Sequence, residues 1–264
     1  MKRDFTNVKR IVVKIGSSSL TYEKTHKINI FRIDRLALEI ADIINSGVEV
    51  ILVSSGAIAS GMAKLNVDKK PSMLAKKQAL ASVGQNSLME IYNKCFSNYG
   101  YYVGQLLLTK YVIDHDQMYQ NAQNCINEIL KMGIIPIINE NDVISVDEIK
   151  LGDNDNLSSI VARLVNADLL ILLSDIDGLF DKDPKKYPDA KKIDNVTDLN
   201  DLKSIENTDN KSDLGTGGIT TKIKACIDAT KAGIDCVIAN SKDIHILKKI
   251  LDNKPVGTYI KAKN

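Results

Sequence analysis

The chain has 264 residues, of which 44% are hydrophobic and 26% charged, as is usual for a soluble globular protein. Its 35 basic and 33 acidic residues give a formal net charge of +2, which excludes a strong overall attraction to nucleic acid or to an anionic membrane. No apolar run approaches a membrane span, and the N-terminus does not resemble a signal peptide. We therefore expect a cytoplasmic protein, and we interpret its four cysteines, which lack C-x-x-C spacing, as buried free thiols.

The first half of the chain alternates predicted strands with predicted helices. Short runs rich in β-branched residues predict strands at 8–15, 48–53, 101–108 and 134–138. Apolar residues at helical spacing predict helices at 30–44, 72–96 and 117–132. Gly47 and Gly133 end the first and third of these helices, and Gly84 is predicted to break or notch the second.

The second half continues the same alternation after a polar stretch at 139–156. Helices are predicted at 157–165, from the 215–218 glycine cluster to 232, and at 242–251, with strands at 168–173, 234–239 and 257–260. Residues 185–213 are polar and turn-rich. Near-continuous apolar strands that alternate with helices predict a mainly parallel sheet covered on both faces. The fold class is therefore α/β, a three-layer αβα sandwich, and we expect residues 1–264 to form a single domain.

The polar stretch at 139–156, NENDVISVDEIKLGDNDN, follows a buried strand and precedes a helix. It holds four asparagines and six carboxylates, which are Glu140, Asp142, Asp147, Glu148, Asp153 and Asp155. Open α/β sheets bind ligands at the carboxyl ends of their strands. The stretch is thus a metal site, a clamp for a polar substrate, or a solvated loop. Its aspartates lack calcium-loop spacing and no histidine supports a transition metal, which disfavours the first alternative.

Three other predicted strands end in small or acidic residues: Gly16-Ser17-Ser18, Ser54-Ser55-Gly56 and Ser174-Asp175. A single turn of this kind is usually only a turn, but four strand ends on one edge of a parallel sheet predict a cleft. Glycine-rich backbone beside a helix N-terminus binds phosphate, although neither Gly16-Ser17-Ser18 nor the 215–218 cluster matches a known nucleotide fingerprint.

A lysine accompanies each glycine cluster. Lys14 lies inside an apolar strand, where a charge is costly unless an opposite charge meets it; the alternative is that its side chain reaches solvent from the strand end. Lys222 follows the second cluster by one helical turn, and by itself it is equally well explained as a solvated helix lysine. Two lysines that converge on one anionic group indicate phosphoryl transfer. The histidines His26, His115 and His245 have no metal-ligand spacing, which disfavours a zinc site or a Ser-His-Asp triad.

Five segments together resemble the amino acid kinase family, and within it the glutamate 5-kinases. These are KIGSSSL (14–20), VSSGAIASG (53–61), INENDVISVDEIKLGDNDNLS (138–158), LLSDIDGLFDKDP (172–184) and DLGTGGITTK (213–222). The resemblance spans residues 8 to 261 and implies the amino acid kinase fold. It implies ATP-dependent phosphorylation of the γ-carboxylate of L-glutamate to γ-glutamyl phosphate, the first step of proline biosynthesis. The alternatives are a relative that acts on acetylglutamate, aspartate or carbamate, and a non-catalytic nucleotide or amino-acid sensor.

The resemblance also implies roles for individual residues. Lys14 and Lys222 would neutralise the transferring phosphoryl group, and Asp155 would orient both lysines as the third catalytic residue. The nucleotide-binding set implied for ATP comprises Lys14, Gly16, Ser17, Ser174, Asp175, Thr216, Gly217, Gly218, Ile219, Thr220, Thr221 and Lys222.

For the acceptor, the resemblance implies contacts from Ser55, Gly56, Asp142 and Asn154, with Lys150 at the anionic end of the substrate. Asp142 would face the α-ammonium group, and the amide of Asn154 suits a carboxylate. An acetylated or phosphate-bearing acceptor would not need Asp142, so this residue favours glutamate.

Further expectations concern cofactors, partners and domains. Mg²⁺ would be carried mainly by the ATP phosphates, so no residue is assigned as a metal ligand. We expect no nucleic-acid or membrane partner, and a homo-oligomer, either a dimer or a tetramer. Many family members have an additional C-terminal RNA-binding-like domain, and no such domain is expected in this chain.

Overall fold

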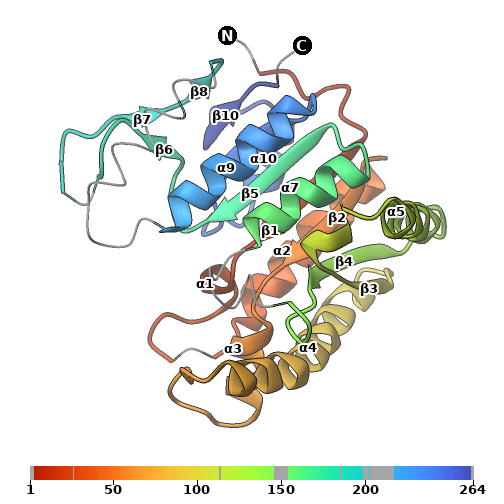
Figure 1. The fold of residues 1–264 in the computed structure, drawn as a ribbon. Coiled ribbons are helices and arrows are strands. Elements are labelled where there is room, and N and C mark those ends of the chain that lie inside the picture. Colours follow the sequence, from red (N-terminus) through yellow and green to blue (C-terminus); the bar gives the residue numbers. More distant parts are fainter. Residues whose placement is uncertain are drawn as a thin grey trace.

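In the computed structural model, residues 3–25, 27–112, 114–145, 154–184, 186–198, 202 and 217–262 are described. Within these residues, eight strands form one sheet in the order β3-β4-β2-β1-β5-β9-β10-β8 (Figure 1). Their bounds are β1 Arg10–Ile15, β2 Glu49–Ser54, β3 Val103–Leu108, β4 Ile135–Glu140, β5 Leu169–Ser174, β8 Asn195–Val196, β9 Asp235–Asn240 and β10 Thr258–Ile260.

The sheet is mainly parallel, as the sequence predicts. Strand β1 lies at its centre and pairs in parallel with β2 on one side and β5 on the other. In this register Lys14 stands between Val53 and Leu172. Strands β10 and β8 are the exceptions, because β10 runs antiparallel to β9 and β8 pairs in parallel with β10. Parallel pairing brings the carboxyl ends of β1, β2, β4 and β5 to the same edge.

Helices cover both faces, so the predicted three-layer αβα sandwich is confirmed (Figure 1). One face of the central strands packs against α5 (Asp116–Lys131), α7 (Asp155–Leu164) and α9 (Gly217–Lys231). The other face packs against α2 (Ile30–Asn45), α4 (Leu74–Ser97) and α10 (Ile246–Leu251). Alternate residues of β1 serve the two cores: Val12 belongs to the first, and Ile11 and Val13 belong to the second.

Helix α4 is continuous through Gly84, so the predicted break or notch is wrong. The glycine instead permits a close helix crossing with α3 (Ala57–Lys64), a helix that the sequence patterns did not predict. A Cβ on Gly84 would lie 1.8 Å from the carbonyl oxygen of Ala57, and a Cβ on Gly61 would lie 2.0 Å from that of Leu80. Both helices therefore need glycine at the point where they cross.

Other differences from the predicted elements are local. Short helices α1 (Ser17–Leu20) and η1 (Lys110–Val112) were not predicted, and a small two-stranded sheet joins β6 (Leu179–Phe180) to β7 (Lys192–Ile193). The 139–156 stretch is divided between elements. Its first two residues belong to β4, and α7 begins at Asp155 rather than at 157.

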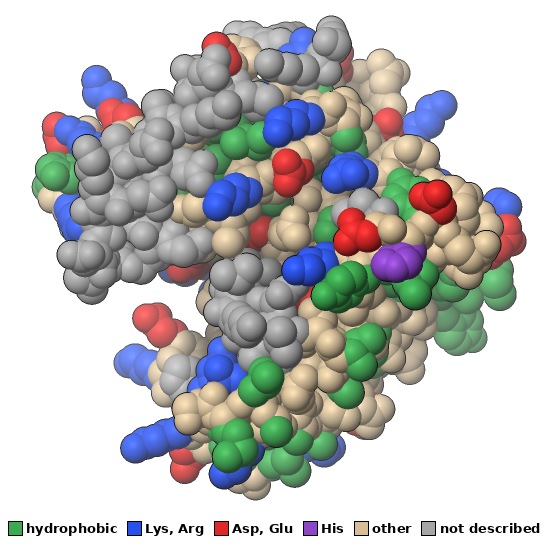
Figure 2. Space-filling view, viewed as in Figure 1, with side chains coloured by type: hydrophobic (Ala, Val, Ile, Leu, Met, Phe, Trp, Pro, Cys, Tyr) green, Lys and Arg blue, Asp and Glu red, His purple; other side chains and the backbone are tan. Residues whose placement is uncertain are grey.

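Basic and acidic side chains are interspersed on the face drawn in Figure 2. In the described part of the chain, every helix is too short or too polar to span a bilayer.

Candidate active site

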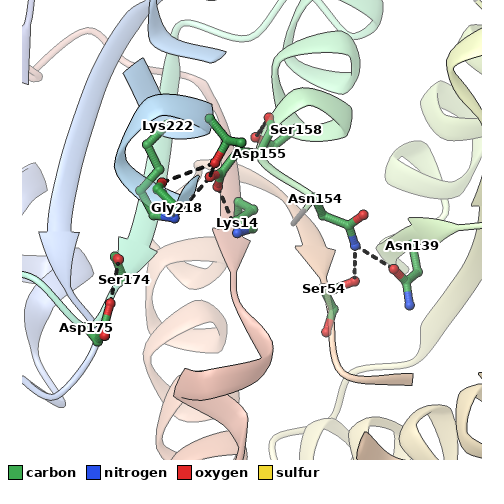
Figure 3. A network of polar contacts seen from close by, with 11 residues as sticks. Lys14, Ser54, Asn139, Asn154, Asp155, Ser158, Ser174, Asp175, Gly218 and Lys222 are labelled. Carbon is green, nitrogen blue, oxygen red and sulfur yellow. Dashed lines mark hydrogen bonds and ion pairs between the residues drawn. The ribbon is translucent and has the colours of Figure 1, made fainter. Parts of the chain in front are cut away.

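One carboxylate joins the two lysines that the sequence singles out (Figure 3). Lys14 Nζ lies 2.7 Å from Oδ1 of Asp155, and Lys222 Nζ lies 3.0 Å from Oδ2. Lys14 comes from β1, Asp155 from α7, and Lys222 from the first turns of α9. Exposed fractions of 1% for Lys14, 0% for Asp155 and 8% for Lys222 show that the charges are removed from solvent.

Burial of three charges requires that each be compensated, because desolvating an ion costs several kcal/mol. Asp155 is the first residue of α7, where the partial positive charge of the helix N-terminus also favours a carboxylate. Thr221 donates a further hydrogen bond of 2.8 Å from Oγ1 to Oδ2 of Asp155. The carboxylate is thus held by two ammonium groups, a hydroxyl and a helix end.

Two glycines place the backbone beside these ammonium groups. A Cβ added to Gly16 would lie 3.6 Å from Nζ of Lys14, and a Cβ added to Gly218 would lie 4.0 Å from Nζ of Lys222. The Lys222 ammonium also donates to the carbonyl oxygen of Gly218 at 3.2 Å. An anionic ligand that contacts the backbone at these glycines can therefore reach the ammonium groups as well, which suits the phosphates of a nucleotide.

A cavity of about 1020 Å³ opens between the segment 17–32 and the segment 56–70. Its lining brings together residues from separate motifs, including Ser17, Gly56, Asp142 and Asp175. Basic side chains of the wall include Lys70 and Arg32, so the cavity offers charges of both signs. A zwitterionic or polyanionic ligand fits such a surface.

Asp142 is the buried carboxylate of this cavity, with an exposed fraction of 6%. Burial, followed by the charge of Glu140, raises the pKa of Asp142 to about 6, although Lys70 acts in the opposite direction. Its Oδ1 atom has no hydrogen-bond partner among the described residues. A ligand ammonium would supply the missing donor and the opposite charge.

The side chain of Asn154 is completely buried beside the end of β2 (Figure 3). Its Nδ2 group donates to the backbone carbonyl of Ser54 at 2.9 Å and to Oδ1 of Asn139 at 2.6 Å. Asn139 in turn donates to Oε1 of Gln85 on α4 at 2.8 Å. The expectation that the Asn154 amide serves a carboxylate does not fit this geometry, because both hydrogens of its NH₂ group are already used.

Most of the predicted site residues lie at this sheet edge. Lys14, Asp155 and Lys222 meet directly; Ser55 and Asn154 are buried beside them, and Ser174 donates to Asp175 at 3.1 Å. Gly217, Gly218, Ile219, Thr220 and Thr221 form the first turns of α9. The predicted residues Lys150 and Thr216 lie outside the described residues.

Sequence patterns missed several residues of this region. Gln85, Ser241 and Lys242 were not singled out, yet the first holds Asn139 and the other two line the cavity. Gln85 could have been noticed in the sequence, because it is a polar residue on the otherwise apolar face of α4. Across the described residues, no group of three or more His, Cys, Asp and Glu side chains gathers closely enough to hold a metal ion.

Comparison with solved structures supports the fold. The chain matches a carbamate kinase from Giardia lamblia with a TM-score of 0.68 and 18% identity, covering 97% of this chain and 99% of that one. A UMP kinase from Bacillus anthracis matches with a TM-score of 0.65 and 17% identity over 99% of this chain and 98% of that one.

Sequence comparison gives closer relatives. The chain is 48% identical to the glutamate 5-kinase of Clostridium perfringens over 269 residues, which covers 100% of this chain and 99% of the relative. It is 47% identical to the glutamate 5-kinase of Lactococcus lactis over 267 residues, which covers 100% of this chain and 98% of the relative. The model of the amino acid kinase family matches residues 9–240. With this match over most of its length, the chain belongs to the amino acid kinase family.

Proposed function

We propose that this chain is a glutamate 5-kinase, which uses ATP to phosphorylate the γ-carboxylate of L-glutamate in the first step of proline biosynthesis. Relatives with this name are nearly half identical over the full chain. The observation that carries the proposal is the buried pair of lysines on Asp155, with Nζ–O distances of 2.7 and 3.0 Å. A phosphoryl-transfer site needs fixed positive charge, and a simple sensor does not.

The reaction needs no protein base, because the acceptor carboxylate is already ionised at neutral pH. One oxygen of the γ-carboxylate forms a bond to the γ-phosphorus of ATP, while the bond from that phosphorus to the bridging oxygen breaks. The electron pair of this bond leaves with ADP. Lys14 and Lys222 neutralise charge on the transferring group, and Asp155 keeps the two ammonium groups in place.

For the nucleotide, Gly16, Ser17 and the first turns of α9 would bind phosphate through backbone N–H groups. Ser174 and Asp175 follow β5 on the same edge and complete this proposed site. Mg²⁺, when bound with ATP, spreads and neutralises the charge of the phosphates, and we propose that the phosphates supply most of its ligands.

For the acceptor, Asp142 would pair with the α-ammonium of glutamate, with Ser55, Gly56 and Asn154 as further contacts. The buried position of Asp142 and the unpartnered Oδ1 atom support this assignment. With a pKa of about 6, the carboxyl is mostly ionised at neutral pH and can hold an ammonium. A homo-oligomeric assembly and a cytoplasmic location stay predictions.

An acyl-phosphate trap tests the function. The purified chain is incubated with ATP, Mg²⁺, hydroxylamine and one acid at a time: glutamate, acetylglutamate or aspartate. We expect a hydroxamate with glutamate and little with the other acids, since acetylation removes the ammonium that Asp142 would hold. Product with another acid but not with glutamate would reassign the acceptor. No product with any acid, together with retained ATP binding, would support a sensor.

A further inference from the structure

The orientation of the Asn154 amide is fixed by a backbone group. The carbonyl oxygen of Ser54 can only accept a hydrogen bond, so the atom 2.9 Å from it must be the nitrogen of Asn154. The second hydrogen of the same NH₂ group goes to Oδ1 of Asn139 at 2.6 Å. No hydrogen of the Asn154 side chain is left for a ligand.

A second backbone group fixes Asn139. The N–H of Glu140 donates to Oδ1 of Asn139 at 2.9 Å, so this atom is the oxygen and the other is the nitrogen. The nitrogen donates to Oε1 of Gln85 at 2.8 Å. The series of hydrogen bonds from Asn154 to Asn139 to Gln85 therefore runs in one donor-to-acceptor direction. Two backbone groups, the carbonyl of Ser54 and the N–H of Glu140, fix that direction.

Because both hydrogens of the Asn154 amide are used, only its oxygen, Oδ1, remains for a ligand. This atom is buried and has no hydrogen-bond partner among the described residues. An unpaired buried oxygen costs about 1–3 kcal/mol, and a ligand donor would remove that cost. In Figure 3 the oxygen points away from Ser54 and Asn139, which both contact the nitrogen.

We propose that Gln85 is a positioning residue for the acceptor: through Asn139 it holds the Asn154 amide with its oxygen presented to a hydrogen-bond donor, the α-ammonium of the amino acid. This inference rests on the proposed function. It adds a residue from α4, outside the motifs that carry the family resemblance, and it assigns a direction to the hydrogen bond at Asn154.

Gln85 is suited to this role because it does not move independently of the fold. It is 8% exposed and follows Gly84, whose neighbourhood is fixed by the close crossing with α3. Seven residues further along α4, Tyr92 bonds to Oγ of Ser54 at 2.8 Å. One helix thus supports both groups that surround the Asn154 amide, the end of β2 and Asn139.

The test compares Gln85→Met, which keeps the size but removes the acceptor, with Gln85→Glu, which keeps an acceptor oxygen. Gln123→Met is the matched control, because the Gln123 side chain donates to the carbonyl of Leu164 at 2.7 Å and lies on α5. For each variant we would measure KM for glutamate and for ATP, kcat, and inhibition by glutarate, which lacks the ammonium.

We expect Gln85→Met to raise KM for glutamate about tenfold, as befits a lost hydrogen bond to a charged group, with KM for ATP unchanged. Gln85→Glu should restore KM to within about threefold of the wild type. The inhibition constant of glutarate should not change, because glutarate does not use Oδ1 of Asn154. Gln123→Met should affect thermal stability only.

An unchanged KM for glutamate in Gln85→Met would overturn the inference. So would a rise in the inhibition constant of glutarate equal to the rise in KM for glutamate in this variant. If Gln85→Met does not fold, Gln85→Ala is assayed under the same criteria. Failure of the wild type to bind glutamate in calorimetry would instead overturn the proposed function together with this inference, so the two failures are distinguishable.

Discussion

Asp155 lies between two ammonium groups, so the buried group of three side chains keeps one net positive charge. A carboxylate that formed a single ion pair would leave no charge for a ligand. Because two positive charges face one negative charge, the remaining positive charge favours binding of an anion at this point of the sheet edge. Thr221 fixes the carboxylate oxygen on the Lys222 side without adding charge.

Replacement of Lys222 tests this arrangement. We expect Lys222→Ala to lower kcat by about two to three orders of magnitude with the fold intact, because Asp155 keeps its ion pair with Lys14. The control is Lys224→Ala, an exposed lysine on the same helix, which should retain activity. Hydroxamate formation gives the rate, and circular dichroism checks folding. A Lys222→Ala rate within threefold of the wild type would contradict the lysine assignment.

Glu39 is a second buried carboxylate, on α2 and remote in sequence from the site motifs. Its Oε1 accepts the backbone N–H of Lys248 at 2.8 Å, at the start of α10. Burial raises the pKa of Glu39 from 4.5 to about 7, against the lowering effect of backbone N–H groups. The folded state thus binds this proton more tightly than the unfolded state.

Glu39 therefore makes the stability of the fold depend on pH. A raised carboxyl pKa contributes stability at low pH that is lost as pH rises from 4.5 to about 7. Glu39→Gln stays neutral and keeps an acceptor, so at pH 8 we expect it to exceed the wild type by about 2 kcal/mol in unfolding free energy. Near pH 4.5 the two should be equal. Urea unfolding at both pH values gives the comparison, with the exposed Glu90→Gln as control. A variant less stable than the wild type at pH 8 would refute this.

At the scale of elements, the crossing of α3 and α4 sets the acceptor side of the cavity. Ala57 begins α3 directly after Gly56, whose φ of 104° is left-handed and suits glycine. The carbonyl oxygen of Ala57 packs against Gly84 of α4, so the turn at Ser55-Gly56 depends on a helix that lies outside the motifs.

Gly84→Ala should therefore be destabilising, although alanine is normally the better helix residue by about 1 kcal/mol. The added Cβ would lie 1.8 Å from the Ala57 oxygen and must push the two helices apart. We expect a loss of about 3 kcal/mol in unfolding free energy, with a higher KM for glutamate. Ser82→Ala, at an exposed position of the same helix, should be neutral. A gain in stability for Gly84→Ala would show that the crossing is not tight.

At the scale of the whole molecule, Arg3 joins the beginning of the chain to its far end. Its guanidinium donates to the carbonyl oxygens of Asp194, Lys254 and Gly257 at 2.7, 3.1 and 3.1 Å. It also donates to the carbonyl of Val256, and its carbon lies 5.9 Å from the ring centroid of Tyr259. The buried side chain thus ties the N-terminal segment to β10 and to the turn before β8.

We expect Arg3→Ala to lower the unfolding free energy by about 3 kcal/mol, because several buried carbonyl groups lose their donor at once. Arg3→Lys should recover only part, since an ammonium has three donors and no planar fork. Denaturant unfolding measures the change. A loss below about 0.5 kcal/mol would show that these carbonyls find other donors, such as water.

The sequence by itself determined the α/β class, most strand positions and the set of motifs at the sheet edge. Strands such as β1 and β5 are near-continuous apolar runs, and burial on both faces of a parallel sheet requires that composition. Lys14 within such a run could be recognised as exceptional, because a buried charge demands a partner. Helix α3 could not be recognised, because small residues and a glycine within it conceal its apolar period.

The tertiary structure alone decided which groups meet. Local pattern places Asp155 in a polar stretch, but only the parallel order of β1, β5 and β9 brings α7 and α9 together so that Lys14 and Lys222 share its two oxygens. The direction of the Asn154 amide was equally inaccessible from sequence. It depends on the carbonyl of Ser54 and the N–H of Glu140, which belong to strands far apart in the chain, and hydrogen-bond direction is a property of that contact rather than of the residue type.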